Sequence, residues 1–171
     1  GLGTLGIIGR LAKREESLVM VAQPFSPVAE AFRVLCINIR FSSVDRPLRT
    51  LLVTSPGLAE GKSITVANLA VAMAQAGLRV VAVDADLRRP RLHQLFSLDP
   101  SREKSTGDRP WWGLTGALLE GRVDGMLHTV QQVDGLSILP SGELPPNPAE
   151  IVGSQHMQKV LHKLVEQADI V

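Results

Sequence analysis

Short apolar runs alternate along the chain with longer stretches in which apolar residues recur at helical spacing. The runs at 51–53, 80–83 and 136–139 predict strands, and residues 169–171 begin a further one. The run at 80–83 is uninterrupted, which is typical of a strand buried on both faces of a parallel sheet. The stretches between strands predict helices over about 27–42, 63–77, 90–96, 114–120 and 157–165. This alternation predicts an α/β fold with a mainly parallel sheet.

Turn residues set the expected boundaries of these elements. Ser26 followed by Pro27 is a typical helix start, because serine caps free N–H groups and proline fits the first turn. Gly77 and Gly121 stand where helices are expected to end. The polar stretches 99–110 and 142–148 predict surface loops. Glycines interrupt the first apolar run, so we expect residues 1–25 to be a flexible flank and residues 26–171 to be the folded domain.

Composition narrows the class of protein. The 171 residues are 44% hydrophobic and 20% charged, which is ordinary for a globular domain with its own core. No run approaches the roughly 18–20 apolar residues that a membrane-spanning helix needs. A single cysteine, Cys36, excludes an internal disulfide and makes a structural zinc site a poor hypothesis. This usage suits a reducing compartment.

The distribution of charge points to an anion-binding site. Lys and Arg outnumber Asp and Glu over residues 1–110, and the reverse holds over residues 111–171, although the net charge is only +1. Clustered cations attract ligands that carry phosphate, but ordinary surface variation would give the same pattern. Nucleic acid is not an expected partner, because tyrosine is absent and no basic stripe alternates with stacking residues.

The segment 56–63, Pro-Gly-Leu-Ala-Glu-Gly-Lys-Ser, matches a phosphate-binding P-loop except for proline at its first position. It stands between a predicted strand and a predicted helix, as a P-loop must. Its backbone N–H groups can surround a phosphate, while a lysine reaches the β- and γ-phosphates and a serine hydroxyl ligates Mg²⁺. The alternative is a glycine-rich turn with a solvated lysine. The candidate nucleotide-binding residues are Gly57, Glu60, Gly61, Lys62, Ser63 and Ile64.

A second group of polar residues follows the strand at 80–83. Asp84 and Asp86 come at its carboxyl end, where open α/β sheets bind ligands, and Arg88 follows them. One carboxylate could bind Mg²⁺, the other could accept a proton from a hydroxyl, and Arg88 could neutralise phosphate charge. Alternatively, the carboxylates form structural ion pairs with Arg88 or Arg89.

Together these motifs resemble those of the bacterial tyrosine kinases of the polysaccharide co-polymerase type. Residues 81–90 are similar to the second phosphate-site motif of that family, three apolar residues followed by D-x-D-x-R. Residues 30–38 resemble its E-x-x-R-x-x-R helix, with Glu30 and Arg33 in place and Cys36 at the second arginine. Residues 144–150 also match. Partition and septum-site ATPases have a lysine at the position of Gly57, which argues against that branch.

The resemblance implies a P-loop NTPase with a doubly wound sheet, helices on both faces, and an end just before the family's metal-binding strand. It implies an ATP- and Mg²⁺-dependent protein-tyrosine kinase that regulates capsular or exopolysaccharide synthesis. The implied catalytic residues are Lys62, Asp84, Asp86 and Arg88, and the implied metal ligands are Ser63 and Asp84.

The resemblance also implies partners and a location. These are a membrane co-polymerase segment, a tyrosine-bearing protein substrate, and further copies of the chain in a ring or head-to-tail oligomer through Glu30 and Arg33, weakened by Cys36. The expected location is the cytoplasmic face of the bacterial inner membrane. Glu30 and Arg33 could instead be a simple helix pair.

Two other functions remain open at this point. The chain could be an ATPase switch that phosphorylates no protein, or a non-catalytic nucleotide-binding module for assembly. Because the printed sequence has no tyrosine and stops where the metal-binding strand is expected, we expect little kinase activity from residues 1–171 alone.

Overall fold

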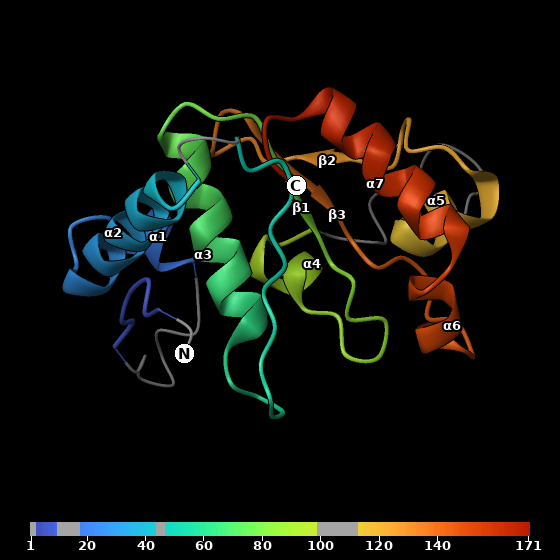
Figure 1. Ribbon diagram of the computed structural model, residues 1–171, viewed down its shortest axis with the longest axis horizontal. Helices are drawn as coiled ribbons and strands as arrows, with labels where there is room; N and C mark the ends of the chain where they lie inside the picture. The colour runs from blue at the N-terminus through green and yellow to red at the C-terminus, as the bar shows by residue number, and fades with distance from the viewer. Residues whose placement is uncertain (1–2, 10–17, 44–46, 99–112) are drawn as a thin grey trace.

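A computed structural model describes residues 3–9, 18–43, 47–98 and 113–171. At its centre is a three-stranded sheet in the order β1–β3–β2 (Figure 1). β1 (Val80–Val83) pairs in parallel with β3 (Leu136–Leu139), and β2 (His128–Thr129) pairs antiparallel with β3. The sheet is therefore mainly parallel, as predicted. The predicted loop at 99–110 lies outside the described residues.

Helices cover both faces of this sheet (Figure 1). One side carries α1 (Val19–Ala22), α2 (Pro27–Phe41), α3 (Lys62–Gln75) and α4 (Leu92–Leu95). The other carries α5 (Leu114–Glu120) and α7 (Gln155–Gln167), with α6 (Pro148–Val152) packed against α7. No helix in the described ranges is long and apolar enough to cross a membrane.

Two hydrophobic clusters form the core, one on each face of the sheet. Val80 and Ala82 of β1 belong to the cluster beneath α2 and α3, whereas Val81 belongs to the one beneath α5 and α7. Neighbouring strand residues point to opposite faces, so the uninterrupted apolar run at 80–83 serves both. Burying each valine of the strand contributes about 1.5–3 kcal/mol, so the strand stabilises both clusters.

Serine caps begin α2 and α7. The Ser26 hydroxyl accepts the Ala29 N–H at the start of α2, and the Ser154 hydroxyl accepts the Met157 N–H at the start of α7. Gly121 ends α5 in the left-handed conformation, at φ 66°. The start of α2 and the end of α5 confirm the boundaries predicted from Ser26, Pro27 and Gly121, whereas the cap at Ser154 was not predicted.

The edge of the sheet beyond β1 is less regular than expected. Residues 51–53 are not a strand, but the Leu51 N–H donates to the Val171 carbonyl (2.8 Å) and the Val171 N–H to that of Arg49 (2.9 Å). Ile170 forms a single parallel bridge with Val80. The segments 49–51 and 169–171 therefore extend the sheet past β1, with the hydrogen-bond pattern of parallel pairing.

Two described parts of the predicted flank, residues 3–9 and 18–25, contact the folded domain. Residues 19–22 form α1, in which Val19 and Met20 are buried. The Met20 N–H donates to the buried Asn68 amide oxygen of α3 (3.0 Å), which satisfies an N–H group that a four-residue helix leaves free. The Leu5 carbonyl accepts the Asn38 side-chain amide of α2 (2.7 Å), so this part of the flank also touches the domain.

Besides α1, two short elements were not predicted, α6 and β2. α6 begins inside the stretch assigned to a loop, with Pro148 in its first turn and no buried residue. β2 has only two residues. Neither is long enough to show a period in the sequence, and both are held by the elements beside them.

Candidate nucleotide-binding site

The two groups of candidate residues lie at the same edge of the sheet. The segment 54–61 leads into the N-terminus of α3, and residues 84–91 connect the carboxyl end of β1 to α4 (Figure 1). α3 packs against both β1 and α4, which keeps the two loops at this edge. Open α/β sheets bind their ligands here.

The P-loop turn has the backbone geometry that a phosphate site needs. Gly61 has φ 87°, in the left-handed region that glycine enters at no steric cost. Ala59 has φ 57°, a conformation that costs a residue with a side chain about 1–2 kcal/mol. No side chain caps α3 after Gly61, so its first N–H groups are open to an anion.

Lys62 is folded back onto its own loop. Its ammonium group donates to the Ser55 hydroxyl (3.0 Å) and to the Gly57 carbonyl (3.2 Å). The Ser55 hydroxyl in turn donates to the Gly57 carbonyl (2.9 Å). Lys62 therefore reaches across the mouth of the loop, where a phosphate would lie. Sequence reasoning missed Ser55, because it precedes the motif and serine is common in turns.

Glu60 closes the loop from the other side. Its carboxylate accepts the Gly57 N–H at 3.0 Å. A Cβ atom at position 57 would lie 2.6 Å from the Glu60 Oε1 atom and push this carboxylate away. Both polar backbone groups of Gly57 are thus held by side chains of the loop.

The first turn of α3 contains Ser63 and Ile64, both half-buried. Within the described ranges no hydrogen bond occupies the Ser63 hydroxyl, which leaves it able to ligate a cation. The Ile64 carbonyl accepts the Asn68 side-chain amide (3.0 Å), so this turn is tied to the amide that also holds α1. The sequence placed both residues in the site but gave no sign of this connection.

Asp84 is buried directly after β1, with 4% of its surface exposed. Its Oδ2 atom accepts the N–H groups of Arg91 and Leu92, each at 2.9 Å, and its Oδ1 atom accepts that of Asp86 at 3.3 Å. Burial raises the pKa of Asp84, against the opposing effect of these hydrogen bonds. Because the Oδ2 atom is fully engaged, the Oδ1 atom is the one left to meet a cation.

Asp86 is exposed and has one free oxygen. Its Oδ1 atom accepts the N–H groups of Arg88 (3.2 Å) and Arg89 (3.0 Å), and no described hydrogen bond involves its Oδ2 atom. The alternative of ion pairs between these carboxylates and the arginines is wrong for the part of the chain described. The carboxylates hold the backbone of the loop and leave the guanidinium groups of Arg88 and Arg89 exposed.

These residues suit a magnesium ion that is shared with a phosphate. No group of three or more His, Cys, Asp or Glu side chains in the described ranges could hold a metal alone. Mg²⁺ at nucleotide sites usually takes one or two protein oxygens, with phosphate and water completing its shell. The Ser63 hydroxyl and the Asp84 Oδ1 atom fit that pattern.

The candidate oligomer contacts lie on α2, away from this edge. Arg33 pairs with Glu30 at 3.0 Å and also donates to the Pro24 carbonyl. Cys36 faces the core, where burial raises the pKa of its thiol. A contact through α2 would therefore use Glu30 and Arg33 without Cys36.

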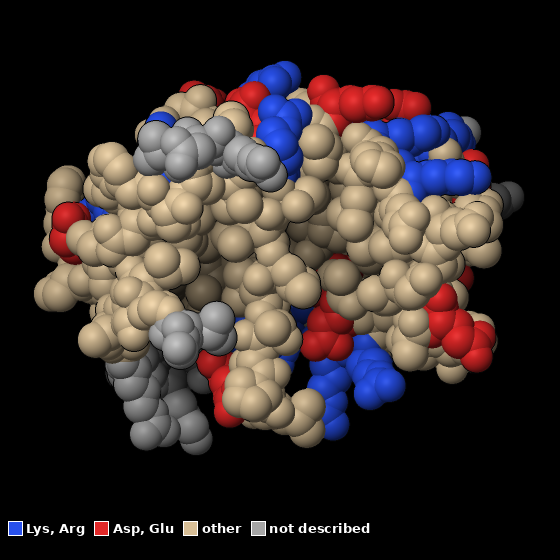
Figure 2. Space-filling model, in the orientation of Figure 1, with Lys and Arg blue, Asp and Glu red and all other residues tan. Residues whose placement is uncertain are grey.

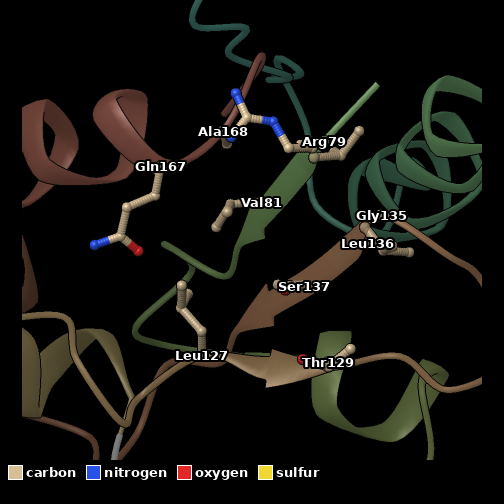
Figure 3. Close-up of a pocket in the computed structure, with 10 residues that line it drawn as sticks. Arg79, Val81, Leu127, Thr129, Gly135, Leu136, Ser137, Gln167 and Ala168 are labelled. Atoms are coloured by element: carbon tan, nitrogen blue, oxygen red, sulfur yellow. The ribbon is translucent and has the colours of Figure 1, made fainter. Parts of the chain in front are cut away.

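A hollow of about 260 Å³ lies at the amino ends of β1 and β3, opposite the end of the sheet that carries the candidate site (Figure 3). Val81, Ser137 and Thr129 line it from the three strands, and Gln167 borders it at the end of α7. Arg79 also lines the hollow, and its guanidinium group pairs with Asp169 at 2.7 Å. None of the P-loop residues or of residues 84–91 lines this hollow, so it is separate from the candidate site.

Comparison with known proteins identifies relatives of this chain. Residues 51–170 match the family described as the CobQ/CobB/MinD/ParA nucleotide binding domain. The tyrosine-protein kinase YwqD of Bacillus subtilis is 36% identical over 164 residues, which cover 95% of this chain and 64% of YwqD. This chain thus spans less than two thirds of that relative.

Solved structures agree with the sequence comparison. The chimerical protein CapA2B2 has a TM-score of 0.84 at 33% identity, over 99% of this chain and 69% of the other. The BceF tyrosine kinase domain has a TM-score of 0.79 at 26% identity, with the same coverage. In both, the similarity spans the P-loop, the loop after β1 and the helices on the two faces.

Proposed function

This chain belongs to the CobQ/CobB/MinD/ParA family of nucleotide-binding domains and is a homologue of bacterial tyrosine-protein kinases, and from that membership we propose that it is the nucleotide-binding domain of a protein-tyrosine kinase that uses ATP and Mg²⁺. The observation that carries the proposal is the pairing of a folded P-loop, with Lys62 across its mouth, and the Asp84–Asp86 loop at the same edge of the sheet.

In this proposal the P-loop binds the phosphates of ATP. The open N–H groups at the start of α3 and the Lys62 ammonium group face their negative charge. The backbone of Gly57, Glu60, Gly61 and Ile64 shapes the loop around them. Arg88 adds positive charge beyond the P-loop.

Magnesium would be held by the Ser63 hydroxyl and the Asp84 Oδ1 atom, together with phosphate oxygens. When bound, it neutralises charge that develops on the transferred phosphoryl group. The backbone N–H groups that hold Asp84 fix its orientation, so the site is arranged before the metal arrives.

Asp86 is the candidate base. Its Oδ1 atom is held by two backbone N–H groups, and its Oδ2 atom, without a hydrogen bond in the described ranges, is able to accept the proton of a tyrosine hydroxyl. The hydroxyl oxygen then attacks the γ-phosphorus. The bond between that phosphorus and the bridging oxygen of ADP breaks, ADP leaves, and the proton of the hydroxyl remains on Asp86. Positioning and charge neutralisation dominate such a transfer, which is what the two loops supply.

The setting of the reaction is part of the same proposal. The substrate is a tyrosine-bearing protein, the process is capsular or exopolysaccharide synthesis, and a membrane co-polymerase segment brings the domain to the cytoplasmic face of the inner membrane. The support for this setting is homology to the tyrosine-protein kinases, and its test is recovery of such a segment with the domain after cross-linking in cells.

Phosphoryl transfer to tyrosine tests the proposed reaction. The whole protein is incubated with γ-labelled ATP, Mg²⁺ and a tyrosine-bearing protein, because the printed sequence contains no tyrosine of its own. We expect label on tyrosine, and Asp86→Asn should lower kcat by about 10²–10⁴-fold with a much smaller change in KM for ATP. Asp124→Asn, an exposed aspartate elsewhere, is the matched control. Hydrolysis of ATP without label on tyrosine would favour the ATPase switch.

A further inference from the structure

The loop after β1 exposes three arginines that the proposed reaction does not fully use. Arg88, Arg89 and Arg91 are all exposed, within four residues of one another. The three ion pairs in the described part of the chain involve other residues, Arg33–Glu30, Arg79–Asp169 and Arg122–Glu120. Figure 2 shows Lys and Arg side chains projecting at the lower edge of the molecule, over this loop. The loop therefore presents unpaired positive charge beside the site.

The carboxylates within the loop hold its backbone rather than its side chains. Asp86 accepts the N–H groups of Arg88 and Arg89, and Asp84 accepts that of Arg91 at 2.9 Å. The main chain that carries the guanidinium groups is thereby fixed on the end of a buried strand. A partner that pairs with these groups would not have to order the loop, which lowers the entropic cost of binding.

We propose that Arg89 and Arg91, with Arg88 beside them, dock an acidic segment of the protein substrate next to its acceptor tyrosine. That the substrate carries an acceptor tyrosine rests on the proposed function. That the arginines bind an acidic segment does not depend on it. Guanidinium groups bind carboxylates through two parallel hydrogen bonds, a geometry that lysine does not offer. Three such groups on a rigid loop fit a run of Asp or Glu.

Other anionic partners fit this loop less well. Nucleotide phosphates already have Lys62 and the start of α3. A membrane-binding loop would also need apolar side chains to insert, and the large apolar residues Leu87 and Leu92 are only 3% and 2% exposed. The loop after β1 thus has charge but no apolar anchor of its own, which favours a protein segment over a lipid surface.

Binding of a labelled peptide, measured by fluorescence anisotropy, tests the proposal without any phosphoryl transfer. The probe has one tyrosine flanked by glutamates, and its partner probe has glutamines instead. We expect the whole protein to bind the glutamate peptide at least about tenfold more tightly at low salt, with the difference shrinking as salt screens the charges. The double variant Arg89→Gln/Arg91→Gln should remove roughly three- to tenfold of that affinity.

The matched control is Arg40→Gln, the same change at an exposed arginine in the last turn of α2. It should leave peptide binding unchanged, and all variants should keep the wild-type circular dichroism spectrum. Equal binding of both peptides, or an equal loss in Arg40→Gln, would overturn the proposal.

Two further arms exclude the other anions. Mg·ADP should not displace the peptide, and vesicles containing phosphatidylserine should not bind. Displacement by Mg·ADP would assign the arginines to the nucleotide, and vesicle binding lost in the double variant would assign them to a membrane; either result overturns the proposal. Failure of tyrosine phosphorylation would contradict the proposed function alone, because peptide binding is measured without it.

Discussion

At the scale of single residues, the position of Lys62 depends on a side chain outside the recognisable motif. The Ser55 hydroxyl accepts from the ammonium group and donates to the Gly57 carbonyl, which the ammonium group also contacts. The three groups form a small network that holds the lysine over the loop before any ligand arrives. A held lysine loses less side-chain entropy when a phosphate binds.

Ser55→Ala should therefore weaken nucleotide binding by a modest amount. Loss of one hydrogen bond of this kind costs about 0.5–1.5 kcal/mol, or roughly two- to tenfold in Kd. Calorimetric titration with Mg·ATP measures the change. Ser137→Ala, at the opposite edge of the sheet, is the control. An affinity equal to that of wild type would show that Ser55 does not position Lys62.

The motif residues themselves could be read from the sequence, but their partners could not. Glycine, lysine and serine in the P-loop and the two aspartates after β1 are separated by fixed short spacings, which a sequence displays directly. Whether Asp84 and Asp86 bind arginine side chains or backbone N–H groups depends on how the chain turns after the strand. The sequence left both arrangements open, and the structure shows the second.

At the scale of elements, the irregular edge beyond β1 is held by charged side chains. Asp169 accepts the Arg79 backbone N–H (2.8 Å) and pairs with the Arg79 guanidinium group. Arg49 donates to the carbonyls of Val165 and Ala168 at the end of α7, where a helix presents free acceptors. Both contacts fasten the segment 169–171 between β1 and residues 49–51.

The Asp169–Arg79 contact predicts a specific dependence of stability on pH. Arg79 lowers the pKa of Asp169 from 3.8 to about 2. A lowered pKa in the folded state means that the contact stabilises the fold above about pH 4 and that this contribution is lost as pH falls toward 2. Asp169→Asn should therefore unfold at a lower urea concentration than wild type at pH 5, and the difference should shrink toward pH 2.

Asp124→Asn provides the control for that series, since Asp124 is exposed and belongs to no ion pair in the described ranges. Its urea midpoints should follow those of wild type over the whole range. A constant difference between wild type and Asp169→Asn from pH 5 to pH 2 would contradict the ionic origin of the contact.

Helices and strands were predictable where burial gives their apolar residues a regular spacing. They were not predictable where contacts with other elements determine the local structure. β1, β3, α2 and α7 each bury a regular set of apolar residues, and their positions were predicted. α1 is stabilised by burial of Val19 and Met20 and by a hydrogen bond to a buried amide of α3, and Leu51 is held by its hydrogen bond to Val171. Neither circumstance leaves a pattern in the local sequence.

For the molecule as a whole, α2 is the surface through which the family resemblance predicts self-association. Glu30 is the more exposed member of its pair with Arg33, with 65% of its side chain accessible. Val34, Ile37 and Phe41 are exposed on the same helix, although apolar. Cys36 stands where the E-x-x-R-x-x-R motif has its second arginine, and it is buried. An assembly through α2 would therefore lack a contact from that position.

Glu30→Ala should therefore weaken an association that is already weak. We expect the wild-type protein to show concentration-dependent association in sedimentation velocity, and the variant to remain a monomer at higher concentrations. Glu166→Ala, on the exposed side of α7, should sediment like wild type. A ring that persists unchanged in Glu30→Ala would place the contact elsewhere.

The fold as a whole was the most predictable level. The order of predicted strands and helices, with a P-loop after the apolar run at 51–53, favours a mainly parallel sheet that is covered on both faces. The two hydrophobic clusters confirm this arrangement. The flank was the exception, because its contacts with α2 and α3 join residues far apart in the sequence.

If the carboxyl ends of the strands bind a nucleotide through Lys62, calorimetric titration of Lys62→Met with Mg·ATP should show the loss. The variant loses charge-assisted hydrogen bonds worth roughly 1.5–3 kcal/mol, so its affinity should fall about ten- to a hundredfold, whereas Lys159→Met on the exposed side of α7 should bind like wild type. If Lys62→Met binds Mg·ATP as tightly as the wild-type protein does, the P-loop is not the nucleotide site.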